Sequence, residues 1–239
     1  MREWTEGAED AARALADHGV AGLRGAFAAA DCARWVAGAY AGRADWTSDF
    51  GGEQFSLGRA FYTHLEEGKS PSYFADAAAS DARVERHAPG LAAAMRAVAA
   101  ELTRGRVQPR RGWCGPGVHV FPARGKVARR GGVVHFDTEG LTEHQLTRRT
   151  RALSVVAMLQ PPRKGGGLRV WNVAYEGEDH VKHEALRAAS VTATYGVGDV
   201  VAFDSYRLHQ IRPFAGDRDR VSATVHLAEI DAGLWESWF

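Results

Sequence analysis

The spacing of apolar residues divides the chain into a mostly helical first part and a mostly strand-forming second part. In the first part, Thr5 is placed to cap a helix and Gly19 to end it, and a short strand is expected to follow over 20–27. Apolar residues recur at helical spacing in four stretches, which predicts helices over 5–17, 30–42, 80–87 and 91–104.

Two stretches of the first part lack this regular spacing. The aromatic segment 45–68 shows neither period, so we predict irregular structure there, with its aromatic side chains in the core. A basic run that contains Gly and Pro, over 104–112, marks the clearest internal boundary.

Beyond this boundary the chain reads as short β-strands separated by turns. Two prolines at 161–162, three glycines at 165–167 and the glycines of 196–198 supply sharp reversals. Strand-like patterning predicts eight strands, over 117–121, 132–137, 152–160, 168–172, 190–195, 199–203, 209–214 and 220–229. Eight short strands of this kind predict a double-stranded β-helix, or jelly roll, preceded by N-terminal helices.

Length and composition fit one domain. At 239 residues and 45% hydrophobic, the chain can bury one sizeable core. We therefore expect a single domain over 1–239, with helical support over 1–112, a jelly-roll core over 113–230 and an aromatic tail over 231–239.

Charge and cysteine content narrow the possible partners. The formal net charge of +1 favours neither nucleic acid nor a membrane surface, and the basic pairs in expected loops are interpreted as solvated. Two cysteines make no disulfide framework, and the acidic N-terminal stretch differs from a secretion signal. These features predict a cytoplasmic protein with a small-molecule partner, and they leave its oligomeric state open.

Three short motifs carry the candidate chemistry. His135 and Asp137 stand two residues apart in a predicted strand, so they should share a face and bind one cation together. His209 lies in a later predicted strand and offers a third ligand, and two imidazoles with one carboxylate form a facial iron(II) site. Arg220 and Ser222 repeat the two-residue step, and an arginine beside a hydroxyl is suited to receive a carboxylate.

This order of motifs, from about residue 115 to about residue 230, resembles the iron(II)/2-oxoglutarate-dependent oxygenase superfamily. The resemblance implies that iron(II), 2-oxoglutarate and oxygen are required, and that His135, Asp137 and His209 hold the metal. It implies that Arg220 and Ser222 bind the far carboxylate of 2-oxoglutarate. The expected reaction hydroxylates a substrate C–H bond and releases succinate and carbon dioxide.

Two residues separate branches of that superfamily. Halogenases of this kind replace the metal-binding carboxylate with a small residue, whereas Asp137 is present here, which favours hydroxylation. Nucleobase demethylases carry a second arginine six residues after the first, but His226 stands at that position, which counts against nucleobase repair.

Substrate recognition is less clearly marked. The motifs HFDTEG and GGGLRVWN look like those of small bacterial members that act on free amino acids or similar metabolites. The candidate substrate contacts are His119, Arg124, Thr138, Glu139, Asn172 and Trp235. The pair His64 and Glu66 repeats the ligand spacing without strand patterning around it, so we do not assign it to the metal.

Two alternatives remain from the sequence. A cupin-like metal enzyme without 2-oxoglutarate would explain His135, Asp137 and His209 but would leave Arg220 and Ser222 without a role. A catalytically silent metal-binding protein would bind the metal and produce no succinate.

Overall fold

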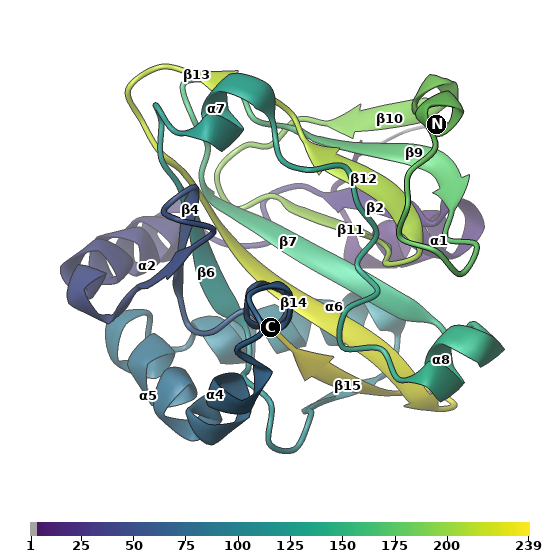
Figure 1. The fold of residues 1–239 in the computed structure, drawn as a ribbon, viewed down its shortest axis with the longest axis horizontal. Helices are drawn as coiled ribbons and strands as arrows, with labels where there is room; N and C mark the ends of the chain where they lie inside the picture. Colours follow the sequence, from purple (N-terminus) through teal and green to yellow (C-terminus); the bar gives the residue numbers. More distant parts are fainter. Residues whose placement is uncertain (1–3) are drawn as a thin grey trace.

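A large mixed sheet forms the centre of the protein (Figure 1), as seen in a computed structural model that describes residues 4–239. Its strands are β1 (Trp4–Thr5), β2 (Val20–Leu23), β3 (Thr47–Asp49), β4 (Gln54–Leu57), β5 (Arg106–Pro109), β6 (Gly117–Phe121), β7 (Ala152–Gln160), β11 (Val200–Asp204), β14 (Arg220–Asp231) and β15 (Leu234–Trp238). They pair in the order β1-β2-β11-β7-β14-β6-β4-β3, and β15 joins β14 to β5.

Two smaller sheets and several helices complete the fold. The smaller sheets contain β10 (Ser190–Ala193), β9 (Leu168–Ala174) and β12 (Arg207–Ile211) in one, and β13 (Phe214–Ala215) and β8 (Lys164–Gly165) in the other. The helices are α1 (Ala8–His18), α2 (Ala29–Ala41), α3 (Phe61–Glu66), α4 (Ser70–Ala75), α5 (Ala77–His87), α6 (Leu91–Thr103), α7 (Lys126–Arg130) and α8 (Glu143–Arg148), with 3₁₀ turns at Arg43–Asp45 and His183–Arg187. The predicted mostly-β chain with N-terminal helices is confirmed.

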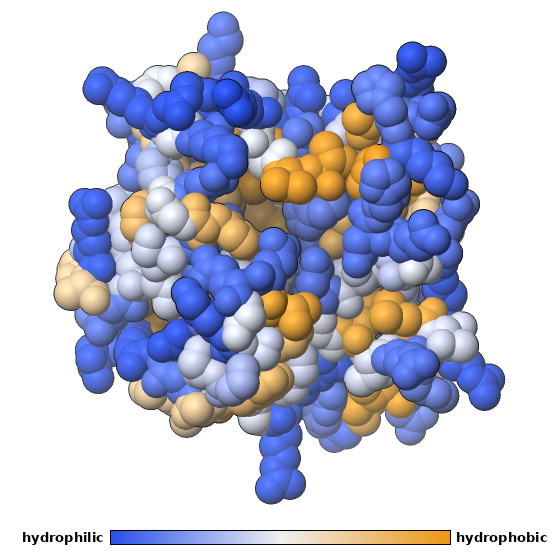
Figure 2. Space-filling view, in the orientation of Figure 1, coloured by the Kyte–Doolittle hydropathy of each residue, from blue (hydrophilic) through white to orange (hydrophobic). Residues whose placement is uncertain are grey.

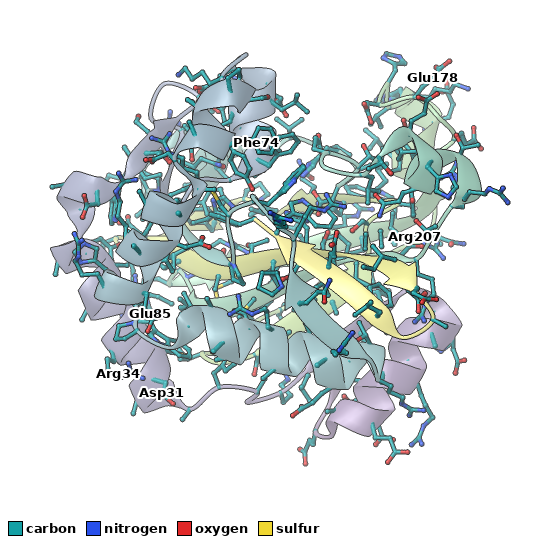
Figure 3. The ribbon with its side chains drawn as sticks, turned by 90° about the horizontal axis from the view of Figure 1, so that it is seen from below. Asp31, Arg34, Phe74, Glu85, Glu178 and Arg207 are labelled. Atoms are coloured by element: carbon teal, nitrogen blue, oxygen red, sulfur yellow. The ribbon has the colours of Figure 1, made fainter. Side chains whose placement is uncertain are left out.

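The large sheet has one apolar face, which packs on helices. On β14, Val221, Ala223 and Val225 belong to the main core together with side chains of α1, α2, α5 and α6. Figure 3 shows helices gathered on one side of the sheet, with Asp31 and Arg34 of α2 at the solvent edge. The intervening residues of β14 point to the opposite face, where they line a cavity.

Several predicted elements differ from the observed ones. Thr5 does not cap α1 but lies in β1, where its hydroxyl donates to the carbonyls of Gly7 and Gly22, and Gly7 is the N-cap. Gly19 ends α1 as predicted, in a left-handed conformation (φ 69°). Most of the predicted strand 132–137 is irregular, because only His135 pairs with a neighbouring strand.

The N-terminal support, jelly-roll core and C-terminal tail expected from the sequence, with divisions at residues 112 and 231, do not form separate layers of the fold. The segment 45–68, predicted to be irregular, contains the hairpin of β3 and β4, and β4 pairs with β6 in the large sheet. The tail 231–239 contains β15, which pairs with β14 and buries Trp238. Residues from both expected outer segments therefore belong to the central sheet.

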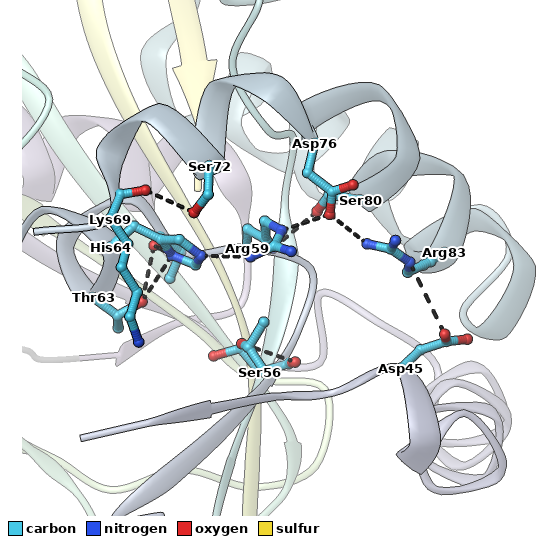
Figure 4. Close-up of polar contacts among 12 residues, drawn as sticks. Asp45, Ser56, Arg59, Thr63, His64, Lys69, Ser72, Asp76, Ser80 and Arg83 are labelled. Atoms are coloured by element: carbon cyan, nitrogen blue, oxygen red, sulfur yellow. Dashed lines mark hydrogen bonds and ion pairs between the residues drawn. The ribbon is translucent and has the colours of Figure 1, made fainter. Parts of the chain in front are cut away.

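A buried and half-buried ion network fixes the connection between β4 and α5 (Figure 4). Arg59 and Arg83 both donate to the carboxylate of Asp76, at 2.6 Å each. The Nε2 atom of His64 lies 2.8 Å from Arg59 Nη1, and its Nδ1 lies 2.9 Å from the carbonyl of Ala60. His64 therefore supports this connection.

The described residues contain no helix with the length and apolar character needed to cross a membrane.

Gly38 allows α2 to approach α5 closely. A Cβ built at this position would lie 1.7 Å from the carbonyl oxygen of His87. Alanine is favoured over glycine inside a helix by about 1 kcal/mol, but backbone cannot move away as a side chain can, so the collision should dominate. We expect Gly38→Ala to lower the free energy of unfolding by roughly 1–3 kcal/mol, measured by chemical denaturation.

Gly7→Ala is the matched control, because nothing lies within 4 Å of a Cβ built there. Because Gly7 is the N-cap of α1, where alanine is a poorer cap than glycine, we expect this variant to cost about 0.5 kcal/mol, less than Gly38→Ala. Equal stability of the two variants would contradict close packing of α2 on α5.

Candidate metal centre

A cavity of about 460 Å³ lies on the face of the large sheet opposite helices α1, α2, α5 and α6. Figure 2 shows a hollow on this face, bordered by hydrophobic and hydrophilic residues. Because side chains alternate along a strand, the cavity receives Arg220, Ser222, Thr224 and His226 from β14. Apolar walls are supplied by Phe50, Phe121, Val156, Leu168, Phe203 and Ile211, among others.

The three predicted metal ligands meet in this cavity. Asp137 Oδ1 lies 3.3 Å from His135 Nε2 and 3.4 Å from His209 Nε2. The ligand atoms of the three residues all lie within 4.8 Å of one another. Among residues 4–239, these three form the group of His, Cys, Asp and Glu side chains that could hold a metal ion. The structure thus brings together residues that are 74 positions apart in the chain.

Backbone pairing holds the two histidines side by side. The amide of His135 donates to the carbonyl of His209 at 3.2 Å, and the amide of His209 donates back at 3.0 Å. The amide of Asp137 donates to the carbonyl of Ser205 at 3.0 Å. Three backbone hydrogen bonds therefore position the segment around His135, although it forms no regular strand.

The ring nitrogens of both histidines are oriented for metal binding. His135 Nδ1 lies 2.9 Å from the carbonyl of Val133, and His209 Nδ1 lies 3.0 Å from the carbonyl of Arg207. Since a carbonyl only accepts, each Nδ1 carries the proton and donates it. Each Nε2 is then the ring nitrogen that is available to a metal, and it faces Asp137. This arrangement of outer hydrogen bonds is typical of metal-bound histidine.

The second carboxylate oxygen of Asp137, Oδ2, contacts side chains other than the two histidines. The Ser154 hydroxyl donates to Asp137 Oδ2 at 2.6 Å, and His226 Nδ1 lies 3.8 Å from the same oxygen. Burial acts to raise the pKa of Asp137, but the electrostatic influence of His209 and His226, together with the contacts of His135 and His209 with the carboxylate, outweighs burial and holds the pKa well below the usual value. Asp137 is therefore ionised, as a metal ligand must be.

These residues fit a divalent transition metal. Two imidazole nitrogens and one carboxylate oxygen on one side of a cavity are the donor set of facial iron(II) sites, which leave the remaining positions open. His135 keeps 41% of its side chain exposed, so the site is accessible from the cavity.

Arg220 is buried with one nitrogen unpaired. Its Nε donates to the carbonyl of Gly166 at 3.1 Å, and its Nη1 donates to Ser222 Oγ at 3.0 Å. Nη2 has no hydrogen-bond partner in the described part of the chain, and neither does the buried hydroxyl of Tyr195. The Arg220 side chain is 1% exposed; burial lowers its pKa, but a guanidinium keeps its charge in proteins.

An unpaired buried guanidinium nitrogen is costly unless an anion binds it. Tyr195 lies beside it, with its ring centroid 5.8 Å from the Arg220 guanidinium carbon. Arg220, Ser222 and Tyr195 therefore fit a carboxylate that reaches them from the cavity.

Of the six candidate substrate contacts, the structure places only His119 in the lining of this cavity. His119 is on β6, paired with Ser222 on one side and Ser56 on the other. Burial, together with the positive charges of His226 and Arg220, lowers the pKa of His119 to about 3. His119 is therefore neutral at physiological pH.

Three of the other candidates lie elsewhere. Arg124 is exposed in the loop after β6, because the chain turns toward solvent there. Asn172 lies on β9 beyond the point where the strand faces the cavity; it accepts a hydrogen bond from Arg207 and lines a separate groove. Trp235 is fully buried in the main core, because β15 pairs with β14 and turns this ring toward the helices.

Thr138 and Glu139 follow the metal ligands but are not among the cavity-lining residues. The Thr138 hydroxyl donates to Asp179 Oδ1 at 3.2 Å. Burial, with the charge of Asp137, raises the pKa of Glu139 to about 7. The carbonyl of the next residue, Gly140, accepts from Arg110, which fixes this loop to the far side of the site.

Sequence reasoning missed several cavity residues. His226 was considered only as the replacement for an arginine, yet the two-residue period from Arg220 places it on the cavity face. Tyr62 and Gln54 line the cavity from a segment that was predicted to be irregular, and no pattern in the sequence marked them. Tyr195 ends a predicted strand, and only the packing of β10 on β9 brings it near Arg220.

Comparisons with known proteins identify the fold. No protein-family model matches the chain, and no curated protein matches it in sequence. The epimerase SnoN, in complex with Fe3+, alpha ketoglutarate and nogalamycin RO, superposes with a TM-score of 0.63 and 16% identity, covering 91% of this chain and 81% of SnoN. The alpha ketoglutarate dependent carbocyclase SnoK from nogalamycin biosynthesis gives a TM-score of 0.61 and 14% identity, covering 93% and 84%.

A third solved structure carries the name of the predicted family. An oxidoreductase of the 2OG-Fe(II) oxygenase family from Burkholderia pseudomallei gives a TM-score of 0.51 and 15% identity, covering 91% of this chain and 88% of that one. At these identities the likeness establishes the fold. The resemblance seen in the sequence is thereby confirmed at that level: the chain has the fold of the iron(II)/2-oxoglutarate-dependent oxygenases.

Proposed function

We propose that this protein is an iron(II)/2-oxoglutarate-dependent oxygenase that hydroxylates a C–H bond of a small molecule and releases succinate and carbon dioxide. The observation that carries the proposal is the presence, in one cavity, of a complete facial ligand set and an unpaired buried arginine nitrogen. A metal enzyme that uses no 2-oxoglutarate would have no role for that arginine.

Each group of residues has a defined part in this function. His135, Asp137 and His209 would hold iron(II), which with 2-oxoglutarate and oxygen supplies the oxidising chemistry when bound. Arg220 and Ser222 would bind the far carboxylate of 2-oxoglutarate, with Tyr195 beside them. The apolar wall that includes Phe121 and Phe203 would exclude water and orient the substrate.

We infer that the substrate is a small metabolite, with free amino acids as the first class to test. A cavity of about 460 Å³ can hold 2-oxoglutarate together with a molecule of modest size. SnoN and SnoK are described as an epimerase and a carbocyclase, so the product has to be identified directly. We also propose that residues 1–239 act as one domain whose facing sheets form the double-stranded β-helix.

Succinate release tests the proposed function. Purified protein is incubated with iron(II), 2-oxoglutarate and oxygen across a panel of free amino acids and related metabolites. We expect succinate that rises with a panel member and disappears in Asp137→Ala, because two remaining ligands hold iron poorly. Bound iron without any succinate, with or without panel members, would contradict the proposal.

His209→Ala should abolish metal binding. His209 is buried and supplies one of the three ligand atoms that lie within 4.8 Å of one another. We expect iron(II) and zinc(II) affinity to fall by more than roughly 100-fold, since changes in outer-shell residues alone cost 10–100-fold. Calorimetry measures this loss, and His180→Ala, which changes an exposed loop residue, is the control. Unchanged affinity would overturn the ligand assignment.

Arg220→Ala should raise the 2-oxoglutarate requirement without changing metal affinity. The substitution removes a charge-assisted pair worth about 2 kcal/mol, which corresponds to a roughly 30-fold weaker apparent affinity. Titration of 2-oxoglutarate into the metal-loaded protein measures the shift. Arg34→Ala, on the exposed surface of α2, should have no effect. An equal affinity in the two variants would place the carboxylate receptor elsewhere.

A further inference from the structure

Three buried side chains fix the protonation of His119. Ser56 Oγ lies 2.6 Å from Asp49 Oδ2 and 2.9 Å from His119 Nδ1. Because a carboxylate only accepts hydrogen bonds, the Ser56 hydroxyl donates its single proton to Asp49. Ser56 can then only accept from the ring, so His119 Nδ1 carries a proton. The neutral ring therefore presents an unprotonated Nε2, and no partner for it lies among residues 4–239.

Tyr62 presents the opposite kind of group to the same cavity. Gln54 Nε2 donates to the Tyr62 hydroxyl oxygen and also lies 3.5 Å from Asp49 Oδ2. The nearby carboxylate oxygen supports the amide orientation in which nitrogen faces this way. Tyr62 therefore accepts from Gln54 and keeps its own proton. Within the described chain no acceptor for that proton is found, and burial raises the pKa of Tyr62, which keeps the hydroxyl protonated.

We propose that Tyr62 and His119 form a subsite for a hydroxyl group of the substrate. The two rings meet edge to face with centroids 5.8 Å apart, and both line the cavity that holds the metal ligands. A substrate hydroxyl donates its proton to His119 Nε2 and accepts the proton of Tyr62. The inference rests on the proposed function, because it names a chemical feature of that enzyme's substrate.

Other polar groups fit this pair less well. A carboxylate accepts from Tyr62 but is repelled by the lone pair of His119 Nε2. An ammonium donates to His119 but cannot accept from Tyr62. An ether oxygen accepts from Tyr62 and has nothing to donate. Only a group that both donates and accepts satisfies both residues, and an unsatisfied buried partner is costly.

The subsite is rigidly supported. Ser56 and His119 are paired across β4 and β6, and Ser56, His119, Asp49 and Gln54 are each at least 94% buried. The chain that leads from Ser56 to Tyr62 passes through Arg59, which is held by Asp76 in the network of Figure 4. Groups fixed in this way lose little freedom on binding, so they can discriminate between similar ligands.

Three probes of similar size test the subsite directly. Cyclohexanol donates and accepts, methoxycyclohexane only accepts, and cyclohexylammonium only donates. Each is titrated into the zinc-loaded protein, with and without 2-oxoglutarate, while the ring nitrogen resonances of His119 are followed by NMR. The unbound protein should show a protonated Nδ1 and an unprotonated Nε2. We expect cyclohexanol to shift Nε2 and to bind about tenfold more tightly than either other probe.

Tyr62→Phe should remove that preference. We expect it to weaken cyclohexanol binding about tenfold while leaving zinc and 2-oxoglutarate affinity unchanged. Tyr175→Phe is the matched control, because Tyr175 lies outside the cavity lining. Ser56→Ala should weaken cyclohexanol binding as well. Without the Ser56 hydroxyl, no hydrogen bond keeps the proton of His119 on Nδ1.

The outcomes separate the two hypotheses. Equal binding of the three probes, or a protonated Nε2 in the unbound protein, would overturn the subsite while succinate release still supports the oxygenase. A weaker 2-oxoglutarate affinity in Tyr62→Phe would assign the pair to the cosubstrate and would also overturn it. Absence of succinate in every assay would contradict the oxygenase, whereas the probe titration would still decide the subsite.

Discussion

Strand β14 presents an apolar face to the helices and a polar face to the cavity, and its register determines where Arg220 and Ser222 lie. Val221, Ala223 and Val225 are fully buried against the helices, whereas Arg220 and Ser222 face the cavity. A slip of one residue would move the guanidinium into an apolar core and the valines into a polar cavity. Pairing of β14 with β6 on one side and β7 on the other prevents this slip. Toward its C-terminal end, β14 also pairs with β15.

Hydrogen-bond donors and acceptors around the cavity divide into those that have a protein partner and those that do not. Several polar atoms around the cavity are satisfied by the protein, as His135 Nδ1 is by the carbonyl of Val133 and Ser56 Oγ is by Asp49. Atoms that lack a protein partner among residues 4–239, such as Arg220 Nη2, therefore indicate what a ligand has to supply. His135, Asp137 and His209 indicate a cation, and Arg220 indicates an anion.

The sequence predicted the parts of this arrangement that depend on local spacing. Strand β7 was predicted with its observed bounds, and Gly19 ends α1 as expected. His135 and Asp137 were placed together because a strand alternates, yet backbone bonds to His209 and Ser205 hold them in an irregular segment. The prediction that His135 and Asp137 lie together was therefore correct, although the strand from which it was argued does not form.

Long-range packing accounts for what the sequence could not predict. The hairpin of β3 and β4 has little apolar alternation, because Asp49, Gln54 and Ser56 are buried polar residues that satisfy one another. A period-based argument treats buried polar residues as loop, so it predicted none of this strand pair. Asn172 and Trp235 were misplaced for a related reason, since the direction of each side chain depends on strand partners that a motif does not identify.

In the proposed enzyme, neutral His119 would link recognition of the substrate to recognition of 2-oxoglutarate. It lies between Ser56 and Ser222 in one row across β4, β6 and β14, next to the residue that Arg220 contacts. A protonated ring here would give the cavity a second cation and a second place for a carboxylate. Burial and the neighbouring positive charges lower the pKa of His119 to about 3, so it presents a lone pair that repels carboxylates. In the proposed function, this repulsion would direct the anionic cosubstrate to Arg220 and leave His119 for a hydrogen-bond donor. The cavity would then discriminate by an unfavourable contact as well as by a favourable one.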